Sequence, residues 1–173
     1  MIRKANKDDI PAVAELYNIM IDYEDTHVKY TSWQKDIYPT AATARLGVKA
    51  NTLYVIEEDG SIVGSVILDT KQPPEYRKVS WSVDAKRGQA LVIHTLCVMP
   101  EHSGGGLGTA LVDLAKDVAR ESGCLCVRLN TSSRNLPAKH LYEKNGFYIA
   151  ATEPMLLNGQ IACGEHLFME CKI

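Results

Sequence analysis

Apolar side chains recur along much of the chain at the spacing of an α-helix, and this spacing predicts where the helices lie. In the first such stretch, apolar positions run from Ile10 to Ile21, and Pro11 is tolerated because it falls in the first helical turn. Asn6, followed by Asp9 three residues later, predicts a capping arrangement in front of this helix. Further helices are expected after Pro39, over residues 107–118 with an end at Gly123, and over Pro137–Lys144.

Apolar runs between turn-forming residues predict β-strands. Two pairs of runs are joined by two-residue hairpin signals, Asp59-Gly60 and Asn158-Gly159. The strands are expected over Ile2–Ala5, Thr52–Glu58, Ser61–Asp69, Val79–Asp84, Ala90–Met99, Cys124–Asn130, Phe147–Leu157 and Ile161–Lys172. This order of elements predicts an α/β (α+β) fold, in which about four helices flank a mixed, mostly antiparallel sheet of about six to seven strands.

Composition indicates a folded globular protein and limits the kinds of partner that it can have. Of the 173 residues, 46% are hydrophobic and 23% are charged, so we expect a single folded domain over residues 1–173. The formal net charge is −2 and no run of Lys or Arg occurs, which disfavours a nucleic-acid partner. No apolar stretch approaches the roughly 18 residues that span a bilayer. We therefore expect a cytoplasmic protein without a membrane partner, and a homodimer stays open.

The five cysteines form no C-x-x-C pair and are odd in number. Cys124 and Cys126 lie two apart in a strand-like run, so both are expected on one face of that strand. We interpret the cysteines as buried, reduced thiols and expect no metal site and no disulfide.

Glycines are concentrated between an apolar strand and an amphipathic helix, in residues 103–109, which we name the glycine turn. Its sequence is Ser-Gly-Gly-Gly-Leu-Gly-Thr. Glycines allow close approach of a ligand to the backbone and permit a positive φ, and the start of a helix offers unpaired N–H groups and a partial positive charge. This arrangement favours a pyrophosphate site, and the alternative is a purely structural tight turn that binds no ligand.

Two other phosphate-binding motifs are excluded by spacing. A dinucleotide fingerprint that uses Gly104 and Gly106 needs Gly or Ala at the position of Thr109. A nucleotide P-loop needs Lys and then Ser or Thr after its last glycine, and no lysine follows Gly108.

The glycine turn resembles the acetyl-CoA turn of the GNAT superfamily of acyl-CoA-dependent N-acetyltransferases. The family pattern, Gln/Arg-x-x-Gly-x-Gly/Ala, falls here on Ser103-x-x-Gly106-x-Gly108, after a strand that also resembles the family's fourth strand. Downstream, Asn135–Phe147 resembles a second family signature, an asparagine followed by Ala, Leu-Tyr and Gly-Phe. Ser103 departs from the pattern and Gly105 replaces an often basic residue, so we expect fewer side-chain contacts with CoA and a lower affinity.

The resemblance implies a role for each matching residue. Backbone groups of Leu96, Cys97 and Val98 are expected to pair with the pantetheine arm of acetyl-CoA, the co-substrate, as an added strand does. Tyr142 is expected to contact CoA and to protonate the leaving thiolate, with packing as the alternative. Asn135 is expected to contact the CoA arm or to cap a helix. The pyrophosphate is expected on Gly104, Gly105, Gly106, Leu107, Gly108 and Thr109, and Ser103 is a further candidate for binding CoA.

The group that accepts the proton of the amine is less well indicated. Many family members have a carboxylate on the fifth strand, where this sequence has Asn130. His94 and Glu24 are the remaining candidates, because an imidazole titrates in the right range and a carboxylate is the usual choice. His94 also fits a purely structural role in its strand.

A polar and aromatic segment, residues 23–38, is expected to cap the acceptor site or to pack against the sheet. Its substrate-binding candidates are Tyr23, Glu24, His27 and Trp33. Carboxylates and aromatic faces both attract a protonated amine. The sequence thus predicts acetyl transfer to a primary amine of a small molecule or peptide N-terminus, by direct attack in a ternary complex. A non-catalytic acyl-CoA-binding or sensing protein and a nucleotide-dependent oxidoreductase are the alternatives.

Overall fold

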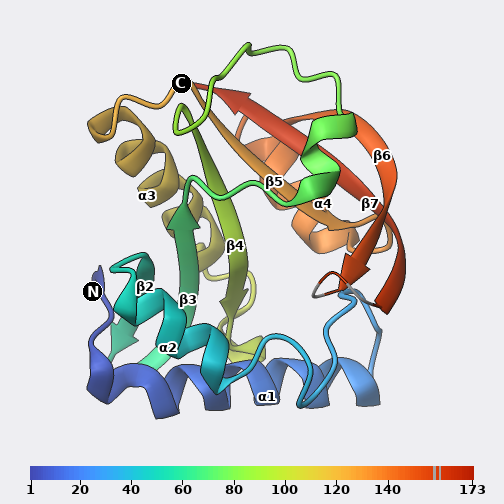
Figure 1. The fold of residues 1–173 in the computed structure, drawn as a ribbon. Coiled ribbons are helices and arrows are strands. Elements are labelled where there is room, and N and C mark those ends of the chain that lie inside the picture. The colour runs from blue at the N-terminus through green and yellow to red at the C-terminus, as the bar shows by residue number, and fades with distance from the viewer. Residues whose placement is uncertain (158, 160) are drawn as a thin grey trace. The chain divides into compact units, whose positions relative to one another are not determined.

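A computed structural model describes residues 1–157, 159 and 161–173 of the chain (Figure 1). The strands form one sheet in the order β1-β2-β3-β4-β5-β7-β6, in which β4 and β5 are parallel and the pairs β1/β2, β2/β3, β5/β7 and β6/β7 are antiparallel. The predicted mixed, mostly antiparallel sheet is therefore confirmed. The helices are α1 (Ile10–Thr26), α2 (Ala41–Lys49), α3 (Leu107–Glu121) and α4 (Leu136–Lys144). The strands are β1 (Ile2–Lys4), β2 (Leu53–Glu58), β3 (Ser61–Asp69), β4 (Ala90–Val98), β5 (Cys126–Ser132), β6 (Tyr148–Leu157) and β7 (Ile161–Lys172).

The chain forms two compact units. The first unit comprises residues 1–29, 33–68 and 94–111, and the second comprises residues 30–32, 69–93 and 112–173. Strand β4 contributes residues to both units. The expectation of a single domain over residues 1–173 stays a prediction. Within the described part of the chain, no helix combines the length and the apolar character that crossing a membrane requires.

The N-terminal cap forms as the sequence predicts. The Asn6 side chain accepts a hydrogen bond from the Asp8 N–H at 2.7 Å, and the Asp9 carboxylate accepts one from the Asn6 N–H at 2.8 Å. Arg3 on β1 in turn donates to Asp9, at 2.7 Å between Nη1 and Oδ2. Hydrogen bonds from Arg3 are the main reason why the pKa of Asp9 lies below its usual value. Asn6 thus caps a short 3-10 helix, η1 (Lys7–Asp9), which leads directly into α1, and Arg3 fastens this cap to β1.

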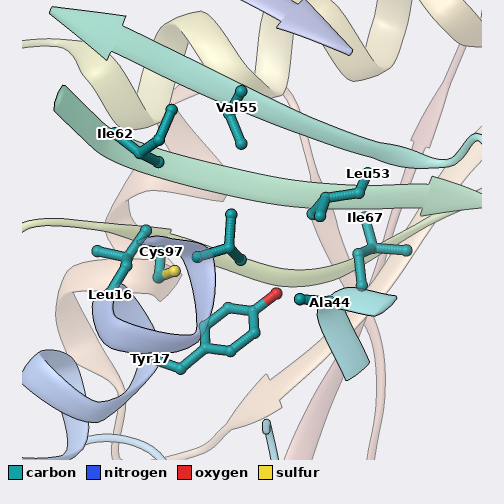
Figure 2. Packing of buried hydrophobic residues seen from close by; sticks show 9 residues of the cluster. Leu16, Tyr17, Ala44, Leu53, Val55, Ile62, Ile67 and Cys97 are labelled. Carbon is teal, nitrogen blue, oxygen red and sulfur yellow. The ribbon is translucent and has the colours of Figure 1, made fainter. Parts of the chain in front are cut away.

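The core of the first unit lies between α1, α2 and strands β2 to β4. Every residue of β3 from Ile62 to Leu68 is buried, and Leu53 and Val55 of β2, two positions apart, lie on the face of the sheet that the two helices cover. Figure 2 shows side chains from all of these elements meeting around Tyr17. The buried cluster comprises Val13, Leu16, Tyr17, Ala44, Leu53, Val55, Ile62, Ile67 and Cys97.

The Asp59-Gly60 signal marks a two-residue turn between β2 and β3. Both residues have positive φ, 49° for Asp59 and 77° for Gly60, which is the conformation that this hairpin turn requires. The second hairpin is present as the antiparallel pair β6/β7. Its predicted turn includes Asn158, which lies outside the described residues.

The predicted strand over Val79–Asp84 is wrong. This segment is irregular and follows a short 3-10 helix, η2 (Pro74–Lys78). Local hydrogen bonds of i to i+2 type, from the Trp81 N–H to Val79 O and from the Ala85 N–H to Val83 O, replace a strand ladder. The alternating apolar pattern here reflects packing of Val79 and Trp81 on a second core cluster, not a strand.

The buried carboxylate of Glu170, in the second unit, accepts hydrogen bonds from other backbone groups of residues 79–84. The Ser82 and Val83 N–H groups donate to Glu170 Oε1 on β7, at 3.0 Å and 3.1 Å. Arg128 on β5 donates to the other oxygen of Glu170 at 2.8 Å, and the Tyr148 hydroxyl also donates to this carboxylate. We name Arg128, Glu170, Tyr148 and the bound backbone of Ser82 and Val83 the clasp.

The start of β5 also differs from the prediction. The strand begins at Cys126, whereas the Cys124 N–H donates to Ala119 O and so completes the end of α3. Gly123, with a φ of 69°, makes the turn between them, as expected for a residue that ends a helix. The two cysteines therefore do not share one strand.

Candidate active site

The glycine turn connects a short 3-10 helix, η3 (Pro100–His102), to α3 in the first unit. Gly104 and Gly106 have φ values of 82° and 85°, which few residues other than glycine adopt. A Cβ atom on either glycine would meet no atom within 4 Å. The conformation, and not crowding within the described residues, is therefore what requires glycine at these two positions.

The main chain of this turn can bind an anion. The first i to i+4 hydrogen bond of α3 runs from the Ala110 N–H to Gly106 O, so the N–H groups of Leu107, Gly108 and Thr109 precede the helical ladder. The dipole of α3 adds a partial positive charge at the same end. The Gly105 N–H differs, because it donates to His102 O at 3.3 Å and is used within the turn.

Side chains contribute little charge to the glycine turn. Residues 103–109 include no Lys or Arg, and Ser103 closes the preceding 3-10 helix through its N–H, which donates to Pro100 O. His102 directly precedes the turn in the chain, and its Nδ1 lies 3.3 Å from Oε2 of Glu58 at the end of β2. The groups that this turn offers to a ligand are therefore mainly main-chain N–H groups, and the lower affinity for CoA expected from Ser103 and Gly105 stays a prediction.

Strand β4 leads into this turn and changes its backbone conformation on the way. Thr95 has a φ of 44°, a left-handed value that is rare for a β-branched residue. After it, Cys97 is buried and Leu96 and Val98 are half-buried, so the expected pantetheine partners alternate in exposure. Burial raises the pKa of the Cys97 thiol to about 12. Cys97 is therefore a protonated core thiol and not a nucleophile.

The acceptor-site candidates of the first unit lie in and after the last turn of α1. The Tyr23 and His27 rings stack with centroids 4.0 Å apart, and Trp33 lies edge-on to Tyr17 at 6.2 Å.

The acidic residues of this segment differ in exposure. Glu24 is buried, with 5% of its surface exposed. Its neighbour Asp25 is exposed and forms an ion pair with Lys29. A second acid of this segment, Asp22, forms an ion pair with Lys35 at 2.7 Å. These two surface charges are therefore largely balanced, and the buried carboxylate is left as the carboxylate candidate. His94, the other proton-acceptor candidate, lies half-buried on β4.

The remaining candidates belong to the second unit. Asn130 on β5 accepts a hydrogen bond from the Tyr76 hydroxyl at 3.1 Å, so an amide and not a carboxylate occupies this position. Asn135 caps α4, because its side chain accepts from the Ala138 N–H at 3.1 Å. Tyr142 on α4 is buried and packs against Phe147, with ring centroids 5.6 Å apart. Capping and packing are thus established for Asn135 and Tyr142, and their roles toward CoA stay predictions.

The sequence interpretation missed the clasp and the partner of Asn130. A signal for the clasp existed, since Arg128 and Glu170 are charges of opposite sign inside otherwise apolar runs. Lone charges in buried strands are almost always paired. No comparable signal linked Tyr76 to Asn130, because they are 54 positions apart along the chain. Among the described residues, no group of three or more His, Cys, Asp or Glu is arranged to hold a metal ion.

Comparison with known proteins places this arrangement in a family. The chain is 29% identical over 146 residues to the uncharacterized N-acetyltransferase YhfO of Bacillus subtilis, which covers 84% of this chain and 88% of that protein. It is 29% identical over 155 residues to the L-amino acid N-acyltransferase MnaT of Escherichia coli, over 90% of this chain and 83% of that protein. The structure of yncA from Salmonella typhimurium with its cofactor acetyl-CoA superposes with a TM-score of 0.70 at 23% identity, over 99% and 92% of the two chains.

The family model described as acetyltransferase (GNAT) family matches residues 13–147, which include most of α1, the glycine turn and α4. This range holds both sequence signatures and strands β2 to β5. The chain therefore belongs to the GNAT family of acetyltransferases.

Proposed function

We propose that this acetyltransferase transfers the acetyl group of acetyl-CoA to the primary amine of a small molecule, by direct attack of the amine within a ternary complex. The observation that carries the proposal is the glycine turn, in which positive-φ glycines lead into the N–H groups that precede the helical ladder of α3. The acetyl-CoA held by the similar yncA structure supports the choice of acyl donor.

Each part of the reaction has a candidate group in the chain. The N–H groups of Leu107, Gly108 and Thr109 hold the pyrophosphate, and the backbone of residues 96–98 pairs with the pantetheine amides. A backbone N–H of β4 faces the thioester carbonyl and stabilises the negative charge that develops on its oxygen. The Tyr142 phenol gives its proton to the CoA thiolate as the carbon–sulfur bond breaks.

The amine must lose a proton before it attacks. An alkyl amine with a pKa near 10.4 is almost fully protonated at pH 7, and deprotonating it costs about 4.6 kcal/mol. Glu24, buried in α1, and His94, half-buried in β4, are the proton acceptors that we propose, directly or through water. Asn130 has no basic atom and is proposed to orient the acceptor through its amide.

An L-amino acid is the first acceptor class to test. The α-amine of an amino acid is small and primary, and the similar protein MnaT is named an L-amino acid N-acyltransferase. The segment with Tyr23, Glu24, His27 and Trp33 offers aromatic faces and a carboxylate for a protonated amine. We therefore extend the proposal to free amino acids, ahead of peptides and folded proteins.

A thiol-release assay tests the proposal directly. The purified protein, acetyl-CoA and a panel of free amino acids and simple amines are mixed, and CoA thiol is followed over time. Amine-dependent release, with the acetylated amine identified by mass spectrometry, is the expected result. Binding of acetyl-CoA in calorimetry without release for any amine would favour an acyl-CoA sensor instead. Absence of acetyl-CoA binding at millimolar concentration would reject both functions.

A further inference from the structure

Two hydroxyl groups in the core of the first unit lie buried without a hydrogen-bond partner anywhere in residues 1–157, 159 and 161–173. They are Tyr17 Oη on α1 and Thr95 Oγ1 on β4. Tyr17 is fully buried, and 8% of Thr95 is exposed. Figure 2 shows the Tyr17 ring pointing from α1 into the apolar cluster, with its oxygen at the inner end. Buried hydroxyls in native proteins are nearly always satisfied by protein groups or by ordered water.

A third hydroxyl lies in the same neighbourhood. Ser65 Oγ on β3 is 3.4 Å from Cys97 Sγ, and either atom can be the donor. Burial raises the pKa of the Tyr17 phenol, while the nearby Thr95 and Ser65 hydroxyls act in the opposite direction. Both hydroxyls thus lie close enough to the phenol to act on it, although neither meets it in full hydrogen-bond geometry. Two hydroxyls without a well-formed hydrogen bond, gathered around the phenol with the Ser65 hydroxyl, suit a buried water, which typically makes about three hydrogen bonds.

The backbone conformation of Thr95 connects these buried hydroxyls to the residues expected to bind pantetheine. The positive φ of Thr95, 44°, is unfavourable for a β-branched residue and persists only where surrounding groups fix it. Thr95 directly precedes Leu96, the first residue expected to pair with pantetheine. A change of φ at Thr95 would rotate the N–H and carbonyl groups that follow it, so a bond to its side chain helps to set their direction.

We propose that Tyr17 and Thr95 are positioning residues, whose hydroxyls share one buried water with Ser65 and so tie α1 to the bend in β4. This bridge holds the backbone of residues 96–98 in the direction that receives pantetheine. The part that concerns pantetheine rests on the proposed acetyl-CoA-dependent function, and the water bridge itself does not.

Thermal unfolding tests the bridge. Tyr17→Phe keeps the buried ring and Thr95→Val keeps the β-branched shape, so each substitution removes one hydroxyl group. With a shared water, each variant has a lower Tm than the wild type, and the double variant loses much less than the sum of the two losses. Without a bridge, removing an unpaired buried oxygen leaves the Tm unchanged or raises it. An unchanged or higher Tm in both single variants, or additive losses in the double variant, overturns the bridge.

Affinity for acetyl-CoA tests the positioning role. Calorimetry at a temperature where every variant is folded is expected to show a Kd roughly three- to tenfold higher for Tyr17→Phe and for Thr95→Val, the range of one hydrogen bond. Val13→Ala is the matched control, since Val13 is also fully buried on α1 and carries no hydroxyl. It is expected to lower the Tm and keep the wild-type Kd.

Two outcomes of the affinity test overturn the positioning role. One is a wild-type Kd in both hydroxyl variants, and the other is an equal loss of affinity in Val13→Ala. A wild-type protein that binds no acetyl-CoA refutes the proposed function instead. The unfolding experiment then still decides whether the water bridge exists.

Discussion

The glycine turn is proposed to bind a pyrophosphate and the clasp holds a buried carboxylate, and the two are built from different groups. In the turn, the groups proposed to bind belong to the main chain, and Gly104 and Gly106 have open space where a side chain would stand. In the clasp, side chains do the binding, and the carboxylate of Glu170 is fully buried against Arg128 at 2.8 Å. An added side chain should therefore occupy the space proposed for the ligand at the turn, whereas a removed side chain should leave a buried group unpaired in the clasp.

The largest effect is expected from adding a carboxylate to the turn. Gly108→Glu places a negative charge in the first turn of α3, where the pyrophosphate is proposed to bind. Repulsion and crowding should abolish binding, so calorimetry with millimolar acetyl-CoA should show no heat. Gly60→Glu, in the β2/β3 hairpin, is the control and should keep the wild-type affinity. Unchanged affinity in Gly108→Glu would show that the turn does not hold the pyrophosphate.

A side chain proposed to act in the chemical step comes next. Tyr142→Phe keeps the packing against Phe147 and removes only the phenol oxygen. Because the phenol is proposed to act as the thiolate forms, kcat should fall by about 10²–10⁴-fold while the Kd of acetyl-CoA stays nearly constant. Steady-state kinetics and calorimetry on the same preparation separate the two effects. Turnover at the wild-type rate would leave Tyr142 as a packing residue.

Removing one charged partner of the clasp should lower the free energy of unfolding and leave the affinity for acetyl-CoA unchanged. Glu170→Ala leaves the guanidinium of Arg128 buried without its carboxylate, and urea unfolding should show a loss of about 3–5 kcal/mol. The pair Arg128→Met with Glu170→Leu removes both charges and should lose much less. If the double replacement is as unstable as Glu170→Ala, the bonds to Ser82 and Val83, and not the ion pair, dominate the clasp.

The clasp also predicts a direction of pH dependence. Burial by itself would raise the pKa of Glu170, but hydrogen bonds from Tyr148 and Arg128 outweigh it and the pKa lies below its usual value. A carboxyl with a lowered pKa stabilises the fold above its unfolded pKa, near 4.3, and loses that contribution as the pH falls through the folded value. Acid unfolding of Glu170→Gln should accordingly be less steep below pH 4.3 than that of the wild type.

A smaller effect is expected from adding a cation to the turn, at its first position. Ser103→Arg restores a side chain that the family pattern has and this chain lacks. At an exposed position, one charge-assisted contact to phosphate should tighten acetyl-CoA binding by roughly two- to fivefold. The gain should shrink as salt rises, whereas Ser103→Ala should match the wild type at every salt concentration. A gain that survives high salt would mean that Arg acts through packing.

The smallest effect concerns the acceptor. Glu24→Gln removes a buried charge proposed to face a protonated amine, and the KM for a cationic acceptor should rise by roughly three- to tenfold. Asp25→Asn is the matched control, because Asp25 is exposed and already paired with Lys29. The KM for acetyl-CoA should not change in either variant. Equal effects of the two substitutions would mean that only the general surface charge matters.

Much of the fold could be predicted because its signals are local. The Asn6 cap, the Asp59-Gly60 turn and the end of α3 at Gly123 each depend on a few adjacent residues with distinctive backbone preferences. The failure at Val79–Asp84 has the opposite cause. The backbone of Ser82 is satisfied by Glu170, 88 positions further along the chain, and no local pattern can indicate such a partner.

The candidate site divides in the same way. The glycine turn could be located because its chemistry is main-chain chemistry, and glycine spacing reports it directly. The placement of Glu24 in the core, and the hydrogen bond from Tyr76 to Asn130, are set by packing between distant segments. The buried hydroxyl of Tyr17 gave no signal either, since tyrosine at a core position of an amphipathic helix is ordinary.

The cysteines have a consequence for how the molecule can be labelled. All five are free, and Cys163 on β7 is the one that is only half-buried. Burial raises the pKa of each thiol, to about 12 for Cys97 and Cys126, so little thiolate exists at neutral pH. An alkylating dye should therefore attach first at Cys163. A fluorophore or spin label could report on the β6/β7 hairpin without any engineered cysteine.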